Sequence, residues 1–184
     1  MRSYRLFFTA VLLCIVFNSN AQTVVSVRDM FYRASKSSDS ADSLFNNFTS
    51  LNKTNDAFTI AYKGMSQLMV CYHSYNPYTK FKYFVKGKES LEQAINKDPQ
   101  NIEFRFLRLS VQLNTPEFLG YYSNINEDKL AIFNGVKTLT DKDLLERIAN
   151  YTFNAKRLSD SEKEEVKKAL FVNKNYTFNK SINF

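Results

Sequence analysis

The chain has 184 residues, a formal net charge of +7 and an aromatic content of 15%, contributed by 17 Phe and 11 Tyr without tryptophan. This length is sufficient for one domain with a core of ordinary size. Basic residues are scattered among acidic ones, and glycine and proline are scarce. The composition therefore argues against nucleic-acid binding and against an all-β domain with many tight turns.

The first 21 residues have the pattern of a secretory signal peptide. Arg2 and Arg5 precede an apolar run from Leu6 to Phe17, and residues 19–21 (SNA) offer small side chains before a cleavage site. The apolar run is too short to cross a bilayer core about 30 Å thick, which disfavours a membrane anchor. We therefore expect cleavage after Ala21, a location in the periplasm or outside the cell, and a net charge that falls to about +5.

Removal of residues 1–21 would leave Cys71 as the remaining cysteine. An intramolecular disulfide is then impossible. An exported chain of this kind has to be held together by its core, for which the phenylalanines and tyrosines supply the apolar area.

Two amphipathic helices are predicted first, over Val24–Ser35 and Asp42–Leu51. Ser40 or Asp42 is the expected cap of the second helix. The triplets 39–41 (DSA) and 42–44 (DSL) resemble the Asp-(Ser/Thr)-aliphatic sequon of Bacteroidetes O-glycosylation. Ser40 and Ser43 are therefore also candidates for glycosylation, and the two interpretations are compatible.

Two longer helices follow, over Asp56–Tyr75 and Tyr78–Lys97, with Pro77 suited to a first helical position. Glycine inside a helix costs about 1 kcal/mol relative to alanine. Since Gly64 lies on the apolar stripe of its helix, we expect another helix to approach it closely.

A helix-turn-helix corner is the most specific local pattern. Pro99 ends one helix because proline disfavours helical geometry in the residue before it. Asn101 can then cap a helix over Ile102–Leu113. This helix is apolar on much of its circumference, which predicts burial on two sides.

Three helices are predicted after Pro116 and an aromatic loop at residues 118–122 (FLGYY). The first starts at Asn124 or Asn126 and ends at Lys137, and its expected buried residues are Leu130, Ile132, Phe133 and Val136. The second starts at Thr140 or Asp141. The third starts at Ser159, in a capping box with Glu162. The chain is thus predicted to be all-α, with about eight helices in antiparallel hairpins. A single domain is expected over 22–172 and a polar tail over 173–184.

The corner resembles a tetratricopeptide repeat, because Gly87, Leu91, Ala94 and Pro99 match the spacing of its second helix. Ile60, Ala61 and Gly64 look like the small-residue face of the first helix of such a repeat. The stretch from residue 56 to 99 is longer than the roughly 34 residues of that repeat, so the resemblance is to one degenerate, lengthened unit. The whole pattern is also similar to a group of uncharacterised exported Bacteroidetes proteins, which implies a compartment but no activity.

Catalytic and metal-binding patterns are poorly supported. His73 is the single histidine, and it lies two positions from Cys71, so the two side chains point to different faces of a helix. The sequence contains no paired Cys/His spacing, no calcium-loop pattern and no glycine-rich phosphate loop. We therefore predict no catalytic residue, metal or cofactor, and regard an enzyme as the less favoured possibility.

The best binding candidates are Arg105, Arg108 and Gln112, which share one face at positions i, i+3 and i+7. Tyr121 and Tyr122 complete the predicted binding residues. The alternative is that the arginines are paired inside the fold, with Glu103, Glu117, Glu127 or Asp128 as partners.

These patterns favour an exported helical interaction or scaffold protein. Its partner would be another envelope protein or a peptide, with no nucleic acid and no transmembrane segment after signal cleavage. The alternative functions are a small cell-envelope enzyme with a glycosidase-like carboxylate pair, or a lipid-binding helical protein.

Overall fold

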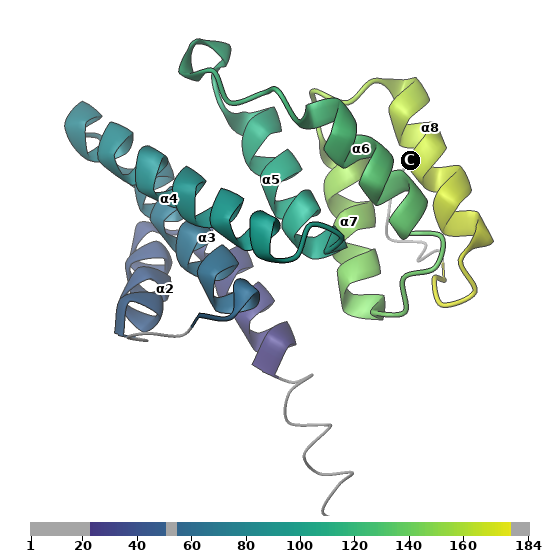
Figure 1. Cartoon of the computed structure of the whole chain (residues 1–184), viewed down its shortest axis with the longest axis horizontal. Coiled ribbons are helices and arrows are strands. Elements are labelled where there is room, and N and C mark those ends of the chain that lie inside the picture. The colour runs from purple at the N-terminus through teal and green to yellow at the C-terminus, as the bar shows by residue number, and fades with distance from the viewer. Residues whose placement is uncertain (1–22, 51–54, 178–184) are drawn as a thin grey trace, which may run out of the picture. The chain divides into compact units, whose positions relative to one another are not determined.

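The computed structural model describes residues 23–50 and 55–177 (Figure 1), so the predicted signal peptide lies outside the described residues. The described part consists of helices and contains no strand, which confirms the all-α class for these residues. After a helix at residues 23–34, the elements are α2 (Ser38–Ser50), α3 (Ala57–His73), α4 (Pro77–Lys97), α5 (Ile102–Asn114), the short 3-10 helix η1 (Glu117–Leu119), α6 (Ile125–Gly135), α7 (Lys142–Asn154) and α8 (Asp160–Val172). In these ranges, none of the helices combines the length and the apolar character needed to cross a membrane.

The chain divides into two compact units, and the boundary falls inside α4, between Ser90 and Leu91. The stretch expected as one domain, 22–172, spans parts of both units.

The core of the first unit is centred on Tyr62, which is 1% exposed. Its ring contacts Phe31, Phe48 and Phe58, at centroid distances of 6.3, 6.2 and 4.7 Å. These contacts join the helix at residues 23–34, α2 and α3, so aromatic packing holds this unit together.

Helices α3 and α4 approach closely at two glycines. A Cβ atom at Gly87 would lie 2.8 Å from the backbone oxygen of Gly64 and 2.6 Å from Cγ of Leu68. The expectation that a neighbouring helix explains Gly64 is therefore confirmed, because a side chain at Gly87 would meet backbone that cannot move aside.

The predicted caps of α5, α7 and α8 are confirmed. The side chains of Asp56, Asn101 and Asp141 accept hydrogen bonds from backbone N–H groups at the starts of α3, α5 and α7. Ser159 and Glu162 form the predicted capping box at α8. These short polar side chains satisfy backbone donors that have no partner inside the helix.

The predictions for α2 and α6 were wrong in detail. Helix α2 begins at Ser38, and Oγ of Ser37 accepts from the backbone N–H of Ser40 at 3.4 Å, so neither Ser40 nor Asp42 is the cap. Helix α6 ends at Gly135 rather than Lys137, and Asn124 before it makes no side-chain cap hydrogen bond. Leu130, expected in the core, is 63% exposed.

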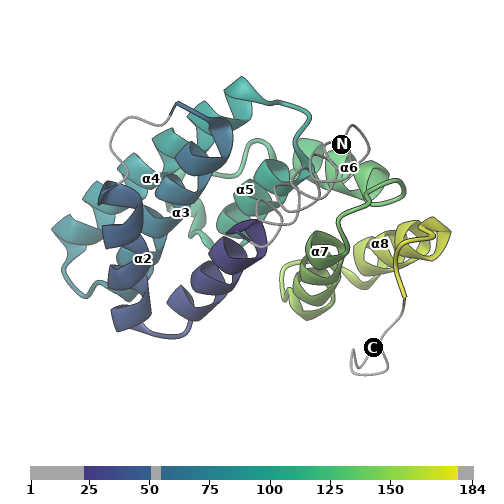
Figure 2. The ribbon, with the colours of Figure 1, turned by 90° about the horizontal axis from the view of Figure 1, so that it is seen from below.

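The core of the second unit combines helices α5 to α8 (Figure 2), in which α5 contacts α6, and α8 contacts both α6 and α7. Its buried apolar side chains are Leu109, Leu113, Ile132, Phe133, Val136, Leu144, Leu145, Ile148, Ala149, Leu158, Val166, Ala169 and Leu170. The start of the predicted tail joins this unit, because Asn173 is buried and its side-chain amide donates to the backbone oxygens of Val136 and Leu139.

Candidate functional site

The polar face of α5 begins at the corner that joins it to α4. Oδ1 of Asn101 accepts hydrogen bonds from the backbone N–H groups of Glu103 and Phe104, at 3.1 and 3.3 Å. Nε of Arg105 donates to the backbone oxygen of Pro99 at 2.9 Å. The cap starts the helix, and the arginine ties its first turn back to the corner.

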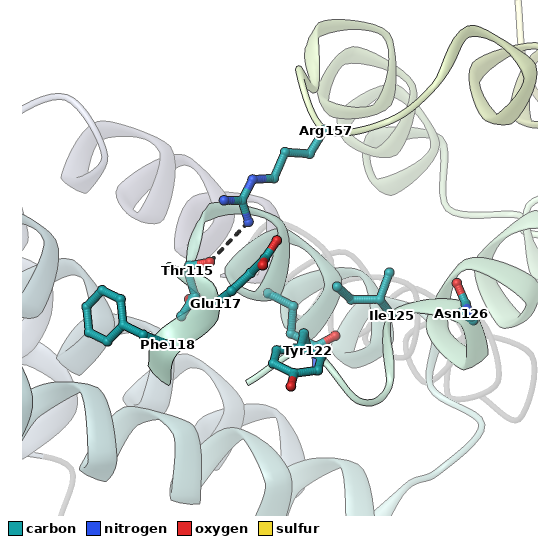
Figure 3. A pocket seen from close by; sticks show the side chains of 8 residues that line it. Thr115, Glu117, Phe118, Tyr122, Ile125, Asn126 and Arg157 are labelled. Carbon is teal, nitrogen blue, oxygen red and sulfur yellow. Dashed lines mark hydrogen bonds between the residues drawn. The ribbon is translucent and has the colours of Figure 1, made fainter. Parts of the chain in front are cut away.

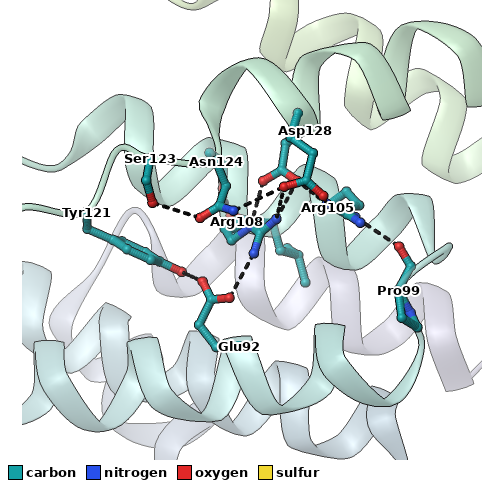
Figure 4. Close-up of polar contacts among 11 residues, drawn as sticks. Glu92, Pro99, Arg105, Arg108, Tyr121, Ser123, Asn124 and Asp128 are labelled. Carbon is teal, nitrogen blue, oxygen red and sulfur yellow. Dashed lines mark hydrogen bonds and ion pairs between the residues drawn. The ribbon is translucent and has the colours of Figure 1, made fainter.

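Asp128 is the centre of an ion-pair network between α5 and α6 (Figure 4). Its side chain is fully buried and accepts from Nη1 of Arg105 at 3.0 Å. It also accepts from Nε and Nη2 of Arg108, both at 2.7 Å. The guanidinium of Arg108 thus makes a bidentate pair, a strong and geometrically specific arrangement.

Two further carboxylates extend this network. Glu127, more than half exposed, accepts from Arg105. Glu92 on α4 accepts from Nη1 of Arg108 at 2.8 Å and from the hydroxyl of Tyr121 at 2.6 Å. We call these six residues, Glu92, Arg105, Arg108, Tyr121, Glu127 and Asp128, the arginine network.

The arginine network shifts the pKa values of its members. Burial alone would lower the pKa of Arg108, but the hydrogen bonds and charges of Asp128 and Glu92 raise it above its ordinary value. Burial and the hydrogen bond to Glu92 raise the pKa of Tyr121. The hydrogen bond from Arg105, assisted by Asn124, lowers the pKa of Glu127. These directions are those of a closed, charge-paired cluster at neutral pH.

Gln112 lies one turn beyond Arg108 on the same face of α5, but it differs from the arginines in its hydrogen bonding. It is 1% exposed, yet neither Nε2 nor Oε1 of its side chain has a hydrogen-bond partner among the described residues. Leaving such a buried group unpaired costs about 1–3 kcal/mol. An unpaired buried amide is rare in a native structure and calls for an explanation.

Gln112 also lines a cavity of about 680 Å³ that is open to solvent (Figure 3). We call this cavity the hollow. It lies where the end of α5, η1 and the start of α6 meet the turn after α7. Its lining residues are Gln112, Thr115, Glu117, Phe118, Tyr122, Ile125, Asn126 and Arg157.

The rim of the hollow is mixed in chemistry. Phe118 and Tyr122 are 86% and 55% exposed. Arg157 reaches from the turn after α7 towards η1, and its Nη1 donates to the backbone oxygen of Thr115 at 3.1 Å (Figure 3). Next to η1, Gly120 has a φ of 65°, a conformation that glycine adopts without strain and that turns the chain back from α5 to α6.

The structure separates the five predicted binding residues into two groups. Gln112 and Tyr122 line the hollow, whereas Arg105, Arg108 and Tyr121 belong to the arginine network. Internal ion pairs with Glu127 and Asp128, which the sequence left open as the alternative for the arginines, are present.

Sequence reasoning missed Thr115, Asn126 and Arg157 as lining residues of the hollow and Glu92 as a network member. Glu117 was named among the possible partners of the arginines and not among the binding residues. Arg157 lies 42 positions from Thr115 along the chain, and no local pattern indicates that they meet.

Other candidate chemistry lies in the first unit. Nε2 of His73 is 2.7 Å from the backbone oxygen of Ala34, a contact that ties the end of α3 to the first helix. Burial raises the pKa of the Cys71 thiol, which disfavours the reactive thiolate. Within the described ranges, no group of three or more His, Cys, Asp or Glu side chains is placed to hold a metal ion.

Comparisons of the chain with protein families, curated proteins and solved structures found no match. The resemblance to a tetratricopeptide repeat and to exported Bacteroidetes proteins therefore stays a prediction.

Proposed function

We propose that this chain is an exported interaction protein whose hollow holds an extended peptide segment of a partner in the cell envelope. The observation that carries this proposal is the buried, unpaired side-chain amide of Gln112 next to an open cavity. A group that is costly to leave unpaired within the fold is satisfied when a ligand supplies its hydrogen bonds.

A carboxamide presents one acceptor and a donor group side by side. In an extended strand, one residue offers its own N–H and C=O on the same side, as in the hydrogen-bonded pairs of an antiparallel ladder. Gln112 can therefore accept from the N–H and donate to the C=O of a single ligand residue. Because the amide is buried, this contact requires its side chain to rotate towards the hollow, and no hydrogen bond to a described residue opposes that rotation.

The rim supplies contacts for the side chains of such a peptide. Aromatic rings that are exposed in the free protein, as at Phe118 and Tyr122, are the residues that most often anchor protein interfaces. Glu117 and Arg157 provide charges of both signs. Among the described lining residues, Glu117 is the one carboxylate, whereas the glycosidase mechanism needs two that flank the scissile bond. The described lining therefore favours binding over that chemistry.

The α3–α4 hairpin and its corner fit the same role if they form a degenerate, lengthened tetratricopeptide-like unit. Two features support this proposal: the close approach of Gly87 to Gly64, and the position of Pro99 two residues after the end of α4. Export would bring the module to the envelope. N-terminal sequencing of the protein from the periplasm should find Gln22 first if the predicted cleavage occurs.

A site-specific photocrosslinker at position 118 tests the proposed peptide site in the native envelope. The matched control places the crosslinker at position 171 on α8, where Phe171 is also an exposed ring, at 67%. We expect one partner segment to be captured from position 118, and its yield to fall with Gln112→Leu. Equal capture from position 171, or an unchanged yield with Gln112→Leu, would contradict the proposed site.

A further inference from the structure

The end of the α3–α4 hairpin carries a cluster of exposed aromatic rings in the first unit. The cluster occupies the last turn of α3, the connecting turn and the first turns of α4. Its rings are between 62% and 100% exposed, and they belong to Tyr72, Tyr75, Tyr78 and Phe81. Exposed apolar groups gathered in one place mark interaction surfaces, whereas single ones are ordinary.

Helical spacing places part of this cluster on one face of α4. Tyr78, Phe81 and Lys82 lie at positions i, i+3 and i+4 and are all exposed. Phe84 and Gly87, on the other side of the helix, are buried. The aromatic face is therefore directed away from the packing between α3 and α4.

All charged side chains in the same stretch of chain are basic. From Ala57 to Lys88 the sequence contains five lysines and no aspartate or glutamate. Lys80, Lys82 and Lys86 are exposed on α4 beside the rings. All acidic residues of the first unit's described part lie outside this stretch, at Asp29, Asp39, Asp42, Asp56 and Glu89.

We propose that this hairpin end binds the surface of an anionic phospholipid bilayer. Tyrosine rings and lysine side chains have apolar bodies and polar tips, so they are stable at the level of the headgroups. Lysines near such a surface gain attraction from anionic lipids. A soluble acidic polymer would account for the lysines but would leave four exposed rings without an apolar environment.

Vesicle flotation tests this proposal on residues 22–184, the expected exported form, so that the apolar run of the predicted signal peptide does not contribute to binding. The vesicles contain phosphatidylcholine alone or phosphatidylcholine mixed with phosphatidylglycerol. We expect binding to the mixed vesicles, weakening by about tenfold or more when Lys80, Lys82 and Lys86 are replaced by glutamine. High salt should weaken binding in the same direction.

The aromatic part is tested by Tyr75→Ser, Tyr78→Ser and Phe81→Ser combined. The matched control replaces three exposed apolar side chains of the second unit that lie outside the lining of the hollow, through Leu130→Ser, Phe171→Ser and Val172→Ser. The hairpin variant should lose binding by about tenfold while the control keeps it. The proposal is overturned if the wild type does not bind anionic vesicles, or if the hairpin variant and the control variant bind them equally well.

Discussion

Helix α5 carries two polar sites on one face, and they differ in how far their hydrogen bonds are satisfied. At Arg105 and Arg108, buried charges meet Asp128 and Glu92, and the guanidinium groups are paired. At Gln112, a buried amide has no partner among the described residues and lies against an open cavity. A polar side chain on a mostly apolar helix can thus serve the fold or remain available to a ligand, and its partners distinguish the two cases.

Asp128→Ala should have the largest effect on the arginine network. It leaves two buried guanidinium groups without their shared carboxylate, and breaking a buried pair in this way costs about 3–5 kcal/mol. The adjacent Glu127→Ala removes a carboxylate that is more than half exposed, and its cost should be about 1 kcal/mol or less. Urea unfolding of both variants measures this difference, and equal losses would show that the network is not a buried structural unit.

Tyr121→Phe and Tyr122→Phe each remove one hydroxyl, the first from the arginine network and the second from the hollow. The Tyr121 hydroxyl donates to Glu92 in a buried setting, and its loss should cost about 1 kcal/mol. Tyr122 is mostly exposed, so its variant should stay within about 0.5 kcal/mol of the wild type. Thermal unfolding measures both, and a larger loss at Tyr122 would place the structural hydroxyl in the hollow.

Acidification should weaken the outer edge of the network slightly. The pKa of Glu127 is lower in the folded chain than in the unfolded chain, so its contribution to stability is present above the unfolded value and disappears as the pH falls through the folded one. Because Glu127 is largely exposed, we expect a contribution of less than about 1 kcal/mol. Comparing wild type with Glu127→Gln between neutral pH and about pH 3 measures it. An unfolding difference that grows on acidification would contradict this sign.

The helices were predictable because their signals are local. Asp56, Asn101, Asp141 and Ser159 cap the helices that they precede, and Pro99 follows the end of α4. The prediction that Leu130 is buried was wrong because α6 is short, and its apolar pattern does not identify the face that packs against the core.

The candidate site was predictable only in part. The sequence could name Glu127 and Asp128 as possible partners of the arginines, since all lie on neighbouring polar helix faces. The sequence could not show that Gln112 is unpaired while the arginines are paired, because pairing depends on which groups come within hydrogen-bond distance in the fold. The hollow depends on Arg157 reaching Thr115 across the fold, and no pattern within either segment encodes that contact.

The stability of Gln112→Leu tests the central claim most directly. If the buried amide is unpaired, an apolar side chain of similar size removes its desolvation cost, and the free energy of unfolding should rise by about 1 kcal/mol or more. Gln67→Leu is the matched control, because Gln67 is also buried but accepts from the hydroxyl of Ser90 at 3.4 Å, so no gain is expected there. Urea unfolding should show a gain for Gln112→Leu alone. A loss of stability in that variant would mean that the amide serves the fold and would contradict the proposed peptide site.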